Sequence, residues 1–167
     1  YPEYKQFINI VLGTISDPLD NRSAVVTAVA VMEGALKELL AAKLIMHEKE
    51  GKNDLFGSGG PLRDFSAKIK IGFALGLYGP QTREDLHVMR EVRNSFAHSM
   101  IPIDFNVADV INVCARIGLQ DRLDPEAAAA AKTLSVRNLF LANIAFLAVE
   151  FFIAPAHPEG FSRWVKS

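Results

Sequence analysis

Apolar residues recur with the period of an α-helix along nearly the whole chain, and no segment shows the strict apolar–polar alternation of a half-buried strand. Phe65, Ile69, Phe73 and Leu77, for example, are spaced four residues apart and would form one stripe on a helix. A length of 167 residues suits one domain that buries its own core. The sequence therefore predicts an all-α fold, a single helical bundle of about six helices over residues 1–167.

Capping residues, glycines and prolines set the expected ends of these helices. Asp20 or Asn21 can cap a long helix, Asp64 can cap the next, and Gly79-Pro80 separates that helix from the one after it. The polar, glycine-rich segment 47–61 is expected to be a loop, and it lacks the Gly-Lys-Ser/Thr ending of a phosphate loop. We expect helices over residues 4–15, 21–46, 65–77, 81–98, 107–117 and 125–154.

The charge, cysteine and hydropathy patterns narrow the function classes. A formal net charge of -1 does not favour autonomous binding to duplex DNA. Four histidines and the single Cys114 form no recognisable metal-ligand set, and we expect no metal and no cofactor. The apolar stretch 139–153 is shorter than the roughly 20 residues that span a bilayer, so we expect a core helix and no membrane span. No signal-peptide pattern is present, and we expect a cytoplasmic protein.

The segment Arg93-Asn94-Ser95-Phe96-Ala97-His98 places an arginine and a histidine near the expected end of a helix. In metal-independent RNA cleavage, His98 would act as general base or acid, Arg93 would stabilise the negative charge of the phosphorane, and Asn94 would orient the phosphate. In an unbroken helix, however, Arg93 and His98 point about 140° apart. Either the helix ends before His98, or the two side chains that cooperate come from two copies in a symmetric dimer.

A structural interpretation of the same residues stands beside the catalytic one. No charge occurs from Val25 to Met32, so Glu33 is the first ionisable group after this stretch, in a helix that is apolar on nearly all sides. Arg93 falls in the apolar sector of its own helix, which predicts a structural ion pair between Glu33 and Arg93. His98 would then serve as a cation at a helix C-terminus. Physical arguments alone favour this structural interpretation.

Several short segments between Leu55 and Ser99 together resemble a known family. These segments are Phe56-Gly57, Pro61-Leu62, Phe65-Ser66-Ala67-Lys68-Ile69, Ala74-Leu75-Gly76-Leu77, Asp85-Leu86 and Arg93-Asn94-Ser95-Phe96-Ala97-His98-Ser99. The sequence they belong to resembles the bacterial mannitol operon repressor family. That family is similar in turn to the HEPN superfamily of helical domains, many of which cleave RNA with an arginine, a polar residue and a downstream histidine. The resemblance implies a HEPN-like bundle.

The resemblance implies two functions for the chain. As a mannitol operon repressor relative, it would restrain transcription of a sugar-alcohol operon, although no helix combines a basic face with a major-groove recognition surface. We therefore expect a homodimeric, non-catalytic regulator that acts through a protein partner. As a HEPN relative, it would be a metal-independent endoribonuclease with Arg93, Asn94 and His98 at a site shared across a homodimer. A third hypothesis is an inactive relative of an antitoxin-bound toxin.

Overall fold

The computed structural model describes residues 9, 13, 20–44 and 54–156, and these residues contain α-helices, short 3₁₀ helices and no strand. The prediction of an all-α bundle of about six helices is confirmed. The elements are α2 (Asn21–Lys43), α4 (Phe65–Ala74), α5 (Pro80–His98), α6 (Ala108–Cys114), η1 (Leu119–Arg122), α7 (Pro125–Ala131), α8 (Val136–Ile153) and η2 (Ala154–Ala156).

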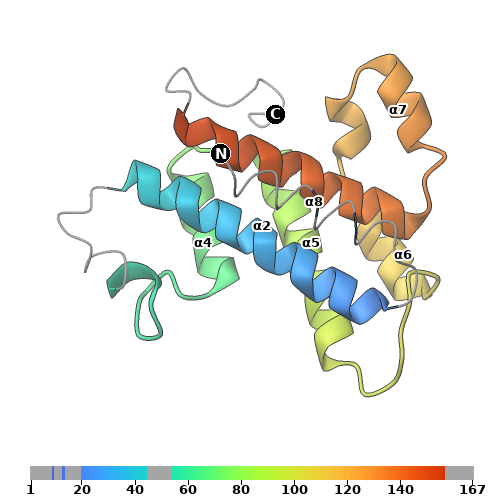
Figure 1. Cartoon of the computed structure of the whole chain (residues 1–167), viewed down its shortest axis with the longest axis horizontal. Helices are drawn as coiled ribbons and strands as arrows, with labels where there is room; N and C mark the ends of the chain where they lie inside the picture. The colour runs from blue at the N-terminus through green and yellow to red at the C-terminus, as the bar shows by residue number, and fades with distance from the viewer. Residues whose placement is uncertain (1–8, 10–12, 14–19, 45–53, 157–167) are drawn as a thin grey trace.

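The two longest apolar helices, α2 and α8, run side by side through the molecule. In the view of Figure 1, α5 crosses behind them. Asp20 caps α2 by accepting hydrogen bonds from the amide groups of Arg22 and Ser23. From α2, Val25, Val29, Met32, Leu36 and Leu40 are fully buried. The uncharged stretch from Val25 to Met32 is buried on one side only, because Val26, Thr27 and Ala30 on the same stretch are exposed. The expectation that this part of the helix is apolar and covered on nearly all sides is therefore wrong.

The core between these helices is rich in aromatic rings. Phe105 lies between Phe96 of α5 and Phe140 of α8, with ring centroids 5.1 and 5.6 Å away. At the other end of the bundle, Tyr78 stacks on Phe151 at 5.6 Å, and its hydroxyl donates to the carbonyl oxygen of Ile69. The Phe105–Phe140 and Tyr78–Phe151 pairs join segments far apart in the sequence, so ring contacts connect the regions before and after α5 to α8.

Several predicted helix ends differ from the structure. The predicted helix 125–154 is wrong as one element: α7 ends at Ala131, and Ser135 starts α8 by accepting a hydrogen bond from the amide of Asn138. α4 ends three residues early because Gly76 adopts a φ of 67°, which glycine tolerates. α2 ends at Lys43, and α6 is shorter than predicted. The predicted helix 4–15 lies outside the described residues except at positions 9 and 13, which are both helical.

Among the described helices, α8 is long and apolar enough, by length and composition, to cross a membrane. In this structure the helix packs along α2 and contacts α5 and α6. Phe140, Leu141 and Ile144 on α8 have no exposed surface. Asn143 is also fully buried, and its side-chain oxygen accepts a hydrogen bond from Arg122. Seven of the 18 residues of α8 are buried, so one side of the helix packs into the core.

A fully buried ion pair connects α5 to η1. Arg122 donates from Nη1 to a carboxylate oxygen of Asp85, and neither side chain is more than 1% exposed. The other oxygen of Asp85 accepts from the amide of Gly118 at 3.0 Å, while Nη2 of Arg122 donates to Thr82. Because both charges are hydrogen-bonded on several sides, their desolvation is compensated only while the whole cluster is intact.

We expect Asp85→Ala to lower the free energy of unfolding by about 3–5 kcal/mol, because it leaves the guanidinium of Arg122 buried without its counter-charge. Urea denaturation followed by circular dichroism measures this loss. The matched control is Asp121→Ala, which removes an exposed carboxylate from the neighbouring residue of η1 and is expected to cost less than about 0.5 kcal/mol. Equal losses in the two variants would contradict the assignment.

Candidate functional site

The three residues of the Arg/His motif lie on α5, which continues unbroken from Pro80 to His98. Ser99 is the C-cap, and its amide bonds to the carbonyl oxygen of Ser95. The hypothesis that the helix ends before His98 is therefore wrong, since His98 is its last helical residue. Helical geometry then directs Arg93 and His98 about 140° apart within one chain. Only a site shared between two copies would bring them to one phosphate.

His98 and Arg93 accordingly have different surroundings. His98 is exposed, and the two residues after the cap, Met100 and Ile101, are 100% and 69% exposed. Nη2 of Arg22 donates to the carbonyl oxygen of Ser99 at 2.6 Å, which ties the first turn of α2 to this end of α5. Arg93, in contrast, is half-buried and lines a pocket one turn earlier on the helix. Asn94 is half-buried beside it and does not line that pocket.

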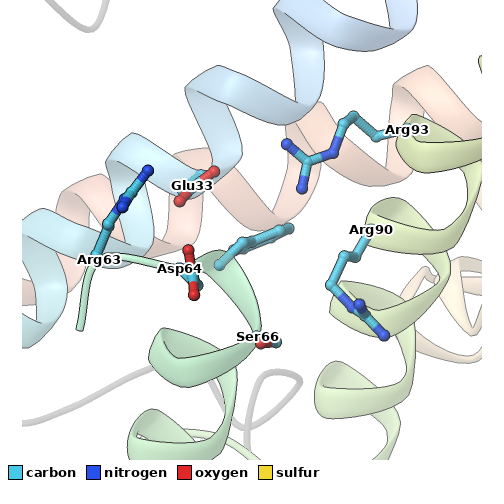
Figure 2. A pocket seen from close by; sticks show the side chains of 7 residues that line it. Glu33, Arg63, Asp64, Ser66, Arg90 and Arg93 are labelled. Atoms are coloured by element: carbon cyan, nitrogen blue, oxygen red, sulfur yellow. The ribbon is translucent and has the colours of Figure 1, made fainter. Parts of the chain in front are cut away.

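The pocket lies between α2, the start of α4 and α5, and has a volume of about 300 Å³ (Figure 2). Glu33 comes from α2, and Arg90 and Arg93 come from α5 one helical turn apart. The remaining lining residues precede or begin α4; they are Arg63, Asp64, Phe65 and Ser66. Three arginines thus meet at one small cavity, although they are separated by up to 30 positions in the sequence.

The carboxylate of Glu33 is bonded by Lys68, not by Arg93. Nζ of Lys68 donates to Oε1 of Glu33 at 2.6 Å and to the carbonyl oxygen of Arg63 at 2.6 Å. The predicted Glu33–Arg93 ion pair is therefore replaced in the structure by a Glu33–Lys68 pair, although Glu33 and Arg93 do line the same pocket. The physical reason is burial. The Lys68 side chain is only 5% exposed, so its charge depends on a nearby anion, whereas Arg93 is half-buried and its charge is partly solvated.

Two arginines of the pocket keep an unused donor. The Nε atoms of Arg90 and Arg93 are buried and have no hydrogen-bond partner among the described residues. Arg63 is exposed and donates from Nη1 to the carbonyl oxygen of Ser58 at 3.2 Å. The Asp64 side chain, although it stands at the N-cap of α4, makes no cap hydrogen bond. Three arginines therefore give the pocket positive charge, and two of them retain a buried donor that has no partner among the described residues.

Sequence reasoning identified Arg93 and Glu33 but missed Arg63, Arg90 and Ser66. The signal for Arg90 was present, because residues three apart on a helix share a face. Arg63 and Ser66 flank the predicted cap Asp64, but nothing local indicates that the start of α4 faces α5. A long-range contact brings these residues together, and helical periodicity does not specify such contacts.

Other ionisable groups belong to the surface or the core. Arg116 binds both carboxylate oxygens of Glu91 at 2.9 Å and also Glu84 at 2.7 Å. This hydrogen bonding from Arg116 lowers the pKa of Glu91, while burial lowers the pKa of His87. Burial raises the pKa of the Cys114 thiol to about 12, so it has little thiolate at neutral pH. No group of three potential metal ligands occurs in the described part of the chain.

Two solved structures share this arrangement of helices. The X-ray structure of the MtlR–HPr complex from Escherichia coli matches with a TM-score of 0.66 and 19% identity, over 88% of this chain and 99% of the other. The possible transcriptional regulator YggD from Shigella flexneri 2a matches with a TM-score of 0.62 and 14% identity, over 85% and 92% of the two chains. This chain has the fold of MtlR and YggD. No family model and no curated protein matches the sequence.

The resemblance to mannitol operon repressors noted in the sequence is thus confirmed for the fold. The match to MtlR covers nearly the whole of the other chain, so the likeness is not limited to one helical hairpin. The resemblance was carried by the region from Leu55 to Ser99, which contains α4 and α5. This region supplies every pocket residue except Glu33. The MtlR-like part of this chain therefore contains the pocket.

We expect the free energy of unfolding to fall as the pH is lowered from about 7 to 5, because the pKa of His87 is lower in the folded chain than in the unfolded chain. The unfolded chain then binds the proton first. The same sign holds for Glu91 at more acidic pH, where its pairing with Arg116 is lost. Urea denaturation across this range measures the slope, and His87→Gln should flatten it between about pH 7 and 5.5. An unchanged slope in this variant would contradict the assignment.

Proposed function

We propose that this protein is a regulator of transcription that acts through contacts with other proteins and not by reading DNA itself. The observation that carries the proposal is the match to the MtlR–HPr structure, in which a protein with this fold is bound to another protein. YggD, the second match, is described as a possible transcriptional regulator. The net charge of -1 agrees with this proposal, because it provides no excess of basic residues for a DNA backbone. A protein of the HPr type is the first candidate partner.

The exposed end of α5 is the surface that we propose for this contact. Met100 is fully exposed and Ile101 is 69% exposed, which is unusual for two consecutive large apolar residues. Val26 is also exposed and lies one turn after Arg22 on the same face of α2, and Arg22 bonds to Ser99. We call Val26, Met100 and Ile101 the apolar patch. Arg22 and His98 add polar groups beside it, as is typical of the edge of a protein interface.

We expect the full chain to bind purified E. coli HPr in isothermal titration calorimetry, and Met100→Asp/Ile101→Asp to weaken that binding by about tenfold or more, because charges replace buried apolar contacts. Leu75→Asp is the matched control. Leu75 is 45% exposed and precedes α5, whereas the patch follows it, so the helix of 19 residues separates the two sites. Absence of HPr binding by the wild-type chain would remove HPr as the partner.

The regulatory role itself is tested in cells. Expression of this chain in an E. coli strain that lacks MtlR should lower the activity of a reporter driven by the mannitol operon promoter, and the variant of the apolar patch should fail to do so. Purified protein should give no shift of the same promoter DNA in a gel assay. Promoter binding by the protein alone would contradict a mechanism through protein contacts.

The alternative function is a metal-independent endoribonuclease that uses Arg93, Asn94 and His98. The continuous α5 helix argues against it within one chain, because Arg93 faces the pocket and His98 is at the exposed end of the helix. We therefore expect no cleavage of single-stranded or structured RNA in EDTA. Cleavage by the wild-type protein that is abolished by His98→Ala would overturn the regulatory proposal. A homodimer measured by light scattering would be required for such activity.

A further inference from the structure

We propose that the pocket between α2, α4 and α5 binds a small phosphate ester that carries hydroxyl groups. The first observation is the state of its arginines. The Nε atoms of Arg90 and Arg93 are buried without a hydrogen-bond partner among the described residues. Because these two atoms have almost no accessible surface, a ligand oxygen reaches them only when the arginine side chains change rotamer, and the hydrogen bonds then formed recover the free energy of the unpaired donors. Guanidinium groups match phosphate in both geometry and charge, and their hydrogen bonds to phosphate belong to the strong, charge-assisted class.

The charge balance of the pocket fits a dianion. Glu33 is already paired with Lys68, while the Asp64 carboxylate has no ion-pair partner among the residues that the structure describes. Three lining arginines and Lys68 stand against two carboxylates, so these groups have a net charge of +2. A phosphate monoester carries a charge of about -1.5 to -2 at neutral pH. Its binding would neutralise the site without a further change in the protein.

The remaining lining atoms indicate what the rest of the ligand looks like. Figure 2 shows Arg90 and Arg93 extending from α5, with Asp64 and Ser66 at the start of α4 and Glu33 across the pocket. The carboxylate of Asp64, which makes no cap hydrogen bond, can accept hydrogen bonds from ligand hydroxyls. The hydroxyl of Ser66 can donate to a phosphate oxygen, and the ring of Phe65 provides an apolar wall. Carboxylates next to arginines favour a ligand with both anionic and hydroxyl groups.

The size of the pocket limits the ligand to a small molecule. A volume of about 300 Å³ is at the lower end of the range for small-molecule sites, roughly 300–1,000 Å³. A triose or hexose phosphate is of the appropriate size, whereas a folded nucleic acid or protein segment is not. The lining residues come from α2, α5, the start of α4 and the two residues before it, so a ligand held by all of them would connect α2, α4 and α5. This inference does not depend on the regulatory proposal.

The test measures ligand binding by calorimetry and by the shift of Tm in thermal unfolding. Glycerol 3-phosphate, glucose 6-phosphate, inorganic phosphate and unphosphorylated glucose are the probes, each at millimolar concentration. We expect at least one of the two phosphate esters to bind and raise Tm more than inorganic phosphate does, and glucose to have no effect. Arg90→Gln/Arg93→Gln should weaken that binding by about tenfold or more, because two charge-assisted donors are lost.

Arg83→Gln is the matched control, since Arg83 is an exposed arginine of the same helix that lies over the Phe73 ring and not in the pocket. It should bind the ester like the wild type. The double variant should unfold at the same Tm as the wild type or above it when no ligand is present, which separates lost binding from lost folding. No binding of any phosphate probe would overturn the proposal. So would equal binding of ester and inorganic phosphate, or equally strong competition by a single-stranded RNA.

Discussion

The buried pair of Asp85 and Arg122 is the interaction on which the position of α5 depends. Both oxygens of the carboxylate are used, one by the guanidinium and the other by the amide of Gly118, so α5 can neither rotate nor slide without breaking a desolvated contact. Arg122 also bonds to Thr82 on α5 and to Asn143 on α8. The cluster therefore joins α5 to the segment after α6 and to α8, where apolar packing alone would permit several registers.

Once α5 is fixed, each of its sides acquires a separate role. Leu86, Met89, Val92 and Phe96 are buried against the core. Arg90 and Arg93 face the pocket shared with α2 and α4, and Glu84 and Glu91 are held by Arg116 from the segment after α6. A shift of α5 by one residue would rotate all of these sides by about 100°. The arginines of the pocket are thus positioned by packing on the opposite side of the same helix.

The sequence was sufficient for what depends on local patterns and insufficient for what depends on long-range pairing. Helical period and the Gly79-Pro80 boundary located α5 to within one residue, and Asp20 was among the two predicted caps of α2. The break before α8 was missed because an alanine run has high helix propensity, while the decisive cap at Ser135 resembles an ordinary polar residue. Arg122 lies in a short 3₁₀ helix without periodicity, and Lys68 is 35 positions from Glu33. Neither partner could be chosen from spacing.

The continuity of α5 also bears on how the Arg/His motif should be interpreted. The six residues of the motif reach two separate sites. Arg93 lines the open pocket between α2, α4 and α5, whereas His98 lies at the exposed end of α5, close to Met100 and Ile101 in the sequence. For both to act on one phosphodiester, the exposed end of one copy would have to reach the pocket of another copy. That arrangement would cover the apolar patch and fill the pocket together, so a ribonuclease dimer and a free partner surface exclude each other. Binding of a small phosphate ester in the pocket of a chain whose patch stays accessible would therefore favour the regulator.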